Sequence, residues 1–208
     1  AKLASGTDGE LITWDASGDP ATVAVGTSTH VLTSNGVGAA PTFQAVAAGG
    51  FTLATEQSTT SGTEVTFGSI PAGTKMIVIM FNDVSLDGPD HIDVHIGDAG
   101  GLETTGYLGQ GFYIDSSGNT GDGATQGFRI VVKGSSGGAG CAFQGTMILT
   151  LEDAANFTWT GFQVTGEYPD SGLSISGGVK SLSAELTQLS ITSLTDSFDR
   201  GAINIMYQ

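Results

Sequence analysis

The stretch FTWTGFQVTG, residues 157–166, repeats with the two-residue period of a β-strand. Successive side chains of a strand point to opposite faces of its sheet, so Phe157, Trp159, Gly161 and Gln163 would share one face. The stretch therefore predicts a strand. Because similar stretches recur along the chain, it also predicts the fold class.

Strand-like runs follow one another at roughly ten-residue spacing after residue 50, with Gly, Asp, Asn or Ser between them. Two of them, MIVIMF at 76–81 and MILTL at 147–151, are almost continuously apolar and are typical of central strands. The predicted strands lie near residues 51–56, 63–67, 74–82, 90–96, 111–115, 127–133, 142–151, 157–168, 173–180, 189–194 and 202–207.

Helical patterns are nearly missing from this succession. The one candidate is SLSAELTQL at 181–189, whose Leu182, Leu186 and Leu189 fit a helical stripe, although its flanks better suit a connection between strands. Since strands do not alternate with long helices, a parallel α/β sheet is disfavoured. We predict an all-β protein in which residues 49–208 form an antiparallel β-sandwich, jelly-roll-like in type.

A different pattern occupies the first part of the chain. GTDGELITWD at 6–15 matches GTSTHVLTSN at 26–35 position by position, and a Pro follows each copy. The repeats span 6–25 and 26–46, and each reads as a short strand, a Gly-rich turn and a second short strand. The small residues AAGG at 47–50 end this pattern, so we predict a separate segment over residues 1–48.

Two short hairpins cannot bury much apolar surface by themselves. Repeat arrays normally need three or more units for stability, and this chain offers two. Identical segments of two further chains would supply the missing neighbours in an intertwined trimer. The trimer contacts would come from Leu11, Ile12, Trp14, Val31 and Leu32. The alternative is that both hairpins pack on the same chain's main domain.

The composition narrows the classes of partner. The 208 residues include 21 acidic and six basic ones, for a net charge of −15. Such a surface repels nucleic acid and anionic membranes. The start AKLASGTDG has no apolar core of a signal peptide, so we expect synthesis in a cytoplasm without an export signal. The single cysteine, Cys141, cannot form an intrachain disulfide and reads as a small core residue.

The best constellation for chemistry is DGPDHIDVH at 87–95. On a strand, His91, Asp93 and His95 would share one face, and two imidazoles flanking a carboxylate could bind a transition metal. The alternative is an amphipathic strand with a solvated polar face. DSSGNTGDG at 115–123 resembles a loose calcium loop, but it lacks regular acid spacing and a terminal bidentate Glu, and a surface loop explains it equally well.

No catalytic motif stands out. The sequence contains no Gly-x-Ser-x-Gly elbow, no P-loop and no His-Glu-x-x-His, and nothing pairs two carboxylates as a glycosidase requires. We therefore expect no enzyme activity and no cofactor. The stretch GYLGQGFYID at 106–115 could bind a glycan by stacking of Tyr107, Phe112 and Tyr113, although core packing is the simpler account of these rings.

Residues 6–46 resemble the short repeats Gly-Thr-x-Gly-x-x-(Leu/Ile)-Thr-(Trp/Ser)-(Asp/Asn) near the N-termini of tail fibres and of some head-decoration proteins of tailed bacteriophages. The turn residues, the Thr and the trailing Pro all recur, over about a fifth of the chain. The ending ITSLTDSFDRGAINIMYQ at 191–208 is similar to the last strands of small phage β-sandwich domains. The resemblance implies a homotrimer with an N-terminal assembly segment and an outward β domain, and it carries no catalytic motif.

Three functions follow as expectations. The first is a homotrimeric structural protein of a phage virion that decorates or stabilises the capsid, in contact with the major capsid protein or other virion proteins. The second is a short tail fibre or adhesin whose sandwich binds a host glycan. The third, a depolymerase, is disfavoured because neither a long solenoid repeat nor a carboxylate pair is visible.

Overall fold

The computed structural model describes residues 5–46, 49–132, 140–169 and 171–208. All regular secondary structure in these ranges is β-strand, which confirms the all-β prediction. Within the same ranges no helix has the length and apolar character needed to cross a membrane.

The chain divides into two compact units, residues 1–50 and 51–208. The first unit holds two antiparallel hairpins. One pairs β1 (Leu11–Trp14) with β2 (Pro20–Val23), and the other pairs β3 (His30–Thr33) with β4 (Thr42–Ala45). The predicted repeat is thus a repeated hairpin, and the boundary between the units lies two residues after the predicted one.

The second unit contains a nine-stranded antiparallel sheet, the large sheet, in the order β12-β11-β16-β15-β14-β8-β18-β5, with β6 also paired to β18. Its strands are β5 (Thr52–Leu53), β6 (Gln57–Ser58), β8 (Met76–Leu86), β11 (Leu108–Asp115), β12 (Gly118–Ala124), β14 (Ala142–Asp153), β15 (Thr158–Tyr168), β16 (Gly172–Ser181) and β18 (Phe198–Tyr207).

A five-stranded antiparallel sheet, the small sheet, has the order β10-β9-β17-β7, and β13 pairs with β9 beside this path. Its strands are β7 (Glu64–Phe67), β9 (Ile92–Asp98), β10 (Gly101–Glu103), β13 (Phe128–Ile130) and β17 (Gln188–Ser193).

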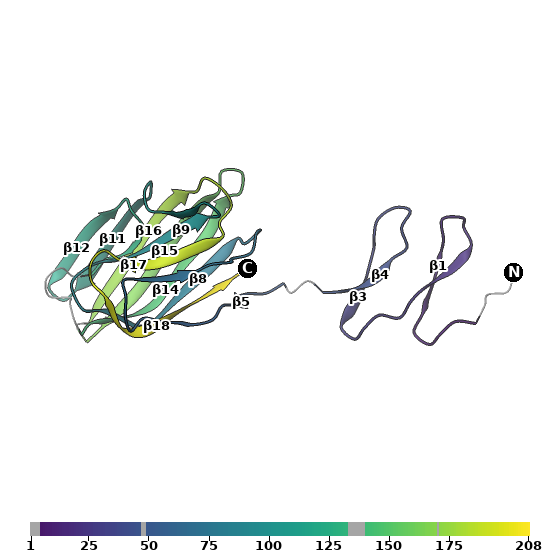
Figure 1. The fold of residues 1–208 in the computed structure, drawn as a ribbon, viewed down its shortest axis with the longest axis horizontal. Coiled ribbons are helices and arrows are strands. Elements are labelled where there is room, and N and C mark those ends of the chain that lie inside the picture. Colours follow the sequence, from purple (N-terminus) through teal and green to yellow (C-terminus); the bar gives the residue numbers. More distant parts are fainter. Residues whose placement is uncertain (1–4, 47–48, 133–139, 170) are drawn as a thin grey trace. The chain divides into compact units, whose positions relative to one another are not determined.

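The two sheets share one hydrophobic core, and Figure 1 shows β9 and β17 lying over strands of the large sheet. Alternate residues of each sheet point into it: Ile92, Val94 and Ile96 from β9, and Ile77 and Ile79 from β8, are all fully buried. The second unit is therefore a two-layer β structure in which each layer buries one face.

The stretch 157–166 keeps its predicted alternation. Trp159, Gly161 and Gln163 point inward from β15, whereas Phe157 precedes the strand. Gly161 has Phe128 of the small sheet directly above it, because a Cβ at Gly161 would lie 2.6 Å from a ring carbon of Phe128. A glycine on the inner face thus lets an aromatic ring reach the large sheet closely.

Each predicted run contains a strand, but β6, β10 and β12 were not predicted. Residues 182–187, in the middle of the helical candidate, connect β16 to β17 without helix. The predicted calcium loop at 115–123 is instead a tight turn followed by most of the edge strand β12, so the surface-loop interpretation is nearer to the structure.

Candidate functional site

The two repeats build the same turn before their first strands. The amide of Glu10 donates to the carbonyl of Thr7 at 3.1 Å, and the amide of His30 donates to that of Thr27 at 3.0 Å. Gly9 has φ +88° and its counterpart in the second repeat, Thr29, has φ +75°. The matched sequences therefore impose matched backbone geometry, even where the second copy lacks the glycine that favours it.

Matched polar residues also close both hairpin loops. The Asp15 carboxylate accepts the amides of Ser17 at 2.8 Å and Asp19 at 2.9 Å. Its counterpart Asn35 donates to the carbonyl of Ala40 at 2.7 Å and accepts Gln44 Nε2 at 3.0 Å. Short polar side chains that bond the backbone a few residues ahead are typical of tight turns. Asp15 and Asn35 thus form hydrogen bonds within their own hairpins. The feature of the unit that these contacts do not explain is its apolar strand residues.

Those apolar residues are exposed. The predicted assembly residues have exposed fractions of 41% for Leu11, 63% for Ile12, 66% for Trp14, 49% for Val31 and 47% for Leu32. Among the described residues of the first unit, Val23 is the single buried apolar side chain. A pair of hairpins that leaves its largest side chains in water gains little from the hydrophobic effect. The five side chains would be buried only against apolar surface that the unit's own hairpins do not supply.

The hairpins leave room for such surface. An open hollow of about 300 Å³ lies within the first unit, lined by residues of both hairpins that include Val23, Val25, His30 and Phe43. Its walls are formed by apolar atoms more than by polar ones. This hollow, with the five exposed assembly residues, is the candidate functional site.

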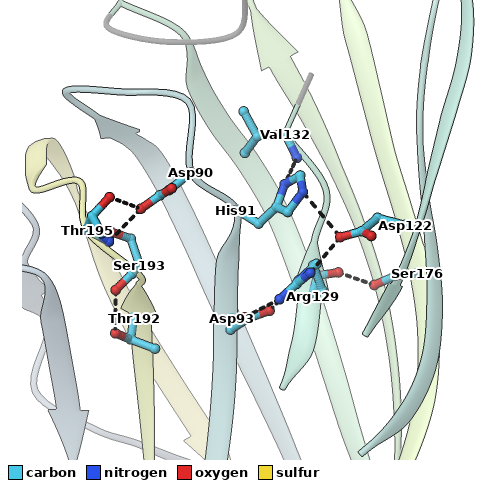
Figure 2. Close-up of polar contacts among 10 residues, drawn as sticks. All are labelled: Asp90, His91, Asp93, Asp122, Arg129, Val132, Ser176, Thr192, Ser193 and Thr195. Atoms are coloured by element: carbon cyan, nitrogen blue, oxygen red, sulfur yellow. Dashed lines mark hydrogen bonds and ion pairs between the residues drawn. The ribbon is translucent and has the colours of Figure 1, made fainter. Parts of the chain in front are cut away.

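The predicted metal ligands lie on or beside β9, with Asp93 and His95 on the strand and His91 directly before it. All three are partly buried while Ile92 and Val94 between them are fully buried, so the shared polar face is as predicted. Figure 2 shows that His91 and Asp93 contact partners other than each other. In the described residues no group of three or more His, Cys, Asp or Glu side chains is arranged to hold a metal ion.

Arg129 of β13 is the centre of this network. It binds Asp93 through two bonds, Nε to Oδ1 at 2.8 Å and Nη2 to Oδ2 at 2.7 Å, and it binds Asp122 of β12 through Nη1 at 2.5 Å (Figure 2). The bond to Asp93 raises the pKa of the guanidinium despite its partial burial. The carbonyl of Arg129 accepts the hydroxyl of Ser176 at 2.5 Å. One residue thereby joins β9 of the small sheet to β12 and β16 of the large sheet.

His91 has both ring nitrogens engaged. Nδ1 accepts the amide of Val132 at 2.9 Å, and Nε2 lies 3.2 Å from Asp122. An imidazole that accepts at Nδ1 and faces a carboxylate at Nε2 is neutral with its proton on Nε2. Burial lowers the pKa of His91, and Arg129 lowers it further, while Asp122 and Asp93 act in the opposite direction. Burial also lowers the pKa of His95.

These two histidines predict a dependence of stability on pH. Between pH 7 and pH 5 the unfolded chain takes up protons near the ordinary histidine pKa of about 6.5, while the folded chain resists them. The free energy of unfolding should therefore fall as the pH is lowered. Denaturant unfolding at several pH values measures this slope, and the double variant His91→Gln/His95→Gln should flatten it. An equally steep slope in the double variant contradicts the assignment.

A second polar group holds the connection after β17. The Asp90 carboxylate accepts the amide of Thr195 at 2.5 Å and its hydroxyl at 2.9 Å (Figure 2). It also accepts the amide of Asp196 at 3.0 Å. Burial alone would raise the pKa of Asp90, but these hydrogen bonds lower it. The acid-rich stretch 87–95 thus fixes loops and strands by internal contacts.

The predicted glycan contact at Tyr107, Phe112 and Tyr113 is wrong for both tyrosines, which are each 1% exposed. The Tyr107 ring meets Phe128 edge-on at 5.2 Å, and its hydroxyl accepts the amide of Ile96 at 2.8 Å. The Tyr113 hydroxyl binds Glu167 in the interior. Residues 111 and 113 of β11 point inward, and among the three predicted contact residues Phe112 alone, 42% exposed, points out. Cys141 is buried at 8% exposure, as predicted.

Sequence reasoning missed Arg129, Asp122 and Ser176. Arg129 binds Asp93, which is 36 residues away, and Ser176, which is 47 residues away, so spacing along the chain did not reveal the network. The sequence did contain one signal of a buried ion pair: Arg129 is one of only six basic residues, and it lies in an apolar run. Comparison of the chain with models of protein families, with curated proteins and with solved structures found no match.

Proposed function

We propose that this chain is a non-enzymatic structural protein of a tailed-bacteriophage virion, a homotrimer that decorates and stabilises the capsid surface. The observation that carries the proposal is the first unit, in which five large apolar residues of two matched hairpins are exposed and only Val23 is buried among the described residues. An element of this kind is explained by assembly, because association supplies the core that it lacks.

Three copies supply six hairpins, which is enough to surround one axis and to cover apolar surface on every chain. The hairpin loops, residues 15–19 and 34–41, are closed by hydrogen bonds of Asp15 and Asn35, so each hairpin would present its strands to a neighbouring chain in a defined geometry. In the homotrimer Leu11, Ile12, Trp14, Val31 and Leu32 would fill the hollows of neighbouring chains. The resemblance of residues 6–46 to phage appendage repeats supports the same arrangement.

The second unit would be the outward module. Its two sheets, which we propose to be a jelly-roll-like sandwich, form a body with a single core, suited to a surface protein. The polar residues that looked most like chemistry support the non-enzymatic assignment. Asp93 and Asp122 are both bound by Arg129, and His91 is held by Val132 and Asp122. Each of these groups has a structural partner.

The double variant Ile12→Asp/Leu32→Asp tests the assembly role. Each change places a charge where an apolar contact is expected, so the variant should elute as a monomer with one third of the wild-type mass by light scattering. Val37→Asp is the matched control, because Val37 is a fully exposed apolar residue of the second hairpin loop and should leave the trimer intact. A double variant that stays trimeric contradicts the proposal.

The copy number of the chain in purified virions tests the place on the particle. Quantitative mass spectrometry against the major capsid protein should give hundreds of copies for a protein that decorates the capsid lattice, because symmetry repeats the trimer many times. A few to a few tens of copies would contradict capsid decoration and would place the chain on the tail.

A further inference from the structure

One face of the second unit is apolar and exposed. It is the outer face of the large sheet, the side away from the core, and it spans β11, β16, β15, β14 and β8. We call it the outer face. Its large exposed residues are Leu108 (70%), Phe112 (42%), Ile114 (42%), Ile148 (38%), Phe162 (52%) and Leu173 (40%).

Strand register makes these residues neighbours. Phe162 of β15 is directly opposite Ile148 of β14, which is in turn opposite Val78 of β8. On the other side, Phe112 of β11 is opposite Ile175 of β16, and Ile114 is opposite Leu173. Directly opposed side chains on one face of an antiparallel sheet touch. The apolar side chains therefore form one continuous patch and not a scatter of single residues.

The outer face also carries no charge. Its outward positions are the alternate residues of 76–80, 108–114, 146–150, 160–166 and 173–179, and each is apolar, Gly, Thr or Gln. The chain as a whole has 21 acidic residues and a net charge of −15. Among the described residues of these strands, the charged ones on this side lie at the margins of the face, such as Glu152 near the end of β14 and the ion pair of Arg200 with Asp83 between β18 and β8. An apolar centre with a charged margin is the composition of a protein interface.

The face has the extent of a small protein interface. Five strands at about 4.8 Å spacing and about seven residues at about 3.3 Å each cover on the order of 500 Å². Burying this area on both partners removes about 1,000 Å² from water, which is at the lower limit for a specific protein interface. A patch of this extent is among the largest that a monomeric protein exposes, and patches of this size are often functional.

We infer that the outer face is an interface between copies of this chain, and that in the trimer proposed above it lies toward the three-fold axis. The inference rests on the proposed function in this one respect, the number of copies. Self-association explains why this face has no charge. Copies with a net charge of −15 each repel one another, and contact through an uncharged face has the lowest electrostatic cost. A positively charged partner would instead favour an acidic contact surface, whereas this face is uncharged.

The test is the reactivity of a thiol placed on the face. Ile148→Cys in the full chain should react with a water-soluble maleimide at least tenfold more slowly than Ser116→Cys, which lies in the exposed turn between β11 and β12. The native Cys141 is buried and is present in every variant, so its slow reaction with maleimide is the same background in all samples. Adding Phe162→Asp, directly opposite position 148, should raise the rate of the Ile148→Cys thiol at least tenfold and lower the molar mass. Leu194→Asp replaces an 80% exposed leucine outside the face and should change neither.

Light scattering on the same samples separates this inference from the hairpin proposal. An oligomer in which the position-148 thiol reacts as fast as that of Ser116→Cys overturns the interface and leaves the hairpin trimer standing. Slow reaction in a monomer overturns it as well, because the chain's own hairpins then cover the face. Fast reaction in a monomer overturns both proposals. An oligomer that survives Ile12→Asp/Leu32→Asp but dissociates with Phe162→Asp supports the interface and contradicts hairpin assembly.

Discussion

Arg129→Met is expected to lower the free energy of unfolding by about 3 kcal/mol. The guanidinium is 15% exposed and Asp93 is 14% exposed, so removal of the arginine leaves a carboxylate with little water and no counter-charge. Asp122 loses its closest cation at the same time. Urea unfolding followed by tryptophan fluorescence measures the change, since Trp159 lies in the shared core.

Arg200→Met provides the matched control. Arg200 pairs with Asp83, but the two side chains are 43% and 49% exposed, and exposed ion pairs contribute less than about 1 kcal/mol. The double variant Asp93→Asn/Arg129→Met should recover part of the loss, because it no longer buries an unpaired charge. Equal losses for Arg129→Met and Arg200→Met would show that the network does not stabilise the fold.

Gly161→Val is expected to cost about 3 kcal/mol through overpacking. A Cβ at this position would lie 2.6 Å from Phe128 and 3.0 Å from Leu149, and both side chains are held in the core. Valine adds two further methyl groups, so the ring of Phe128 must move away from the large sheet. Thermal or urea unfolding should show the loss, and near-ultraviolet circular dichroism should show altered aromatic packing.

Gly177→Val is the control for this effect. Gly177 lies on the neighbouring strand β16 but points to the outer face, and the closest atom to a Cβ there is 3.6 Å away. The substitution should change stability by less than about 1 kcal/mol, because a β-branched residue suits an open strand position. If both glycine variants lost the same stability, the close approach of Phe128 would not be the reason for glycine at position 161.

Both effects depend on contacts between the two sheets, which also bear on the proposed function. The interface that we propose includes β15 and β16, so it depends on those strands keeping their positions in the large sheet. Arg129, Phe128 and Gly161 contact the inner side of those strands. If the proposed interface forms, variants of these residues should also weaken it indirectly.

The sequence by itself determined the strands and the division of the chain. Period-two alternation placed Trp159, Gly161 and Gln163 on one buried face, and the matched ten-residue stretches predicted two matched hairpins. Both signals are local, because strand alternation and turn geometry depend on residues only a few positions apart. Strand β12 was missed because its sequence, GNTGDGA, has almost no apolar residue and therefore no local strand pattern. It forms a strand by pairing with the edge of β11.

Only the tertiary structure decided which faces and which partners the side chains have. The sequence left glycan stacking and core packing open for Tyr107 and Tyr113, and the fold turns both tyrosines into the core while Phe112 points outward. It likewise left a metal site and an amphipathic strand open for Asp93 and His91, and Arg129, 36 residues beyond Asp93, takes up the Asp93 carboxylate. The outer face likewise emerges only when five strands from residues 76–179 are set in register. A sequence specifies local geometry through neighbours along the chain, whereas burial and charge pairing depend on distances through space that sheet order alone sets.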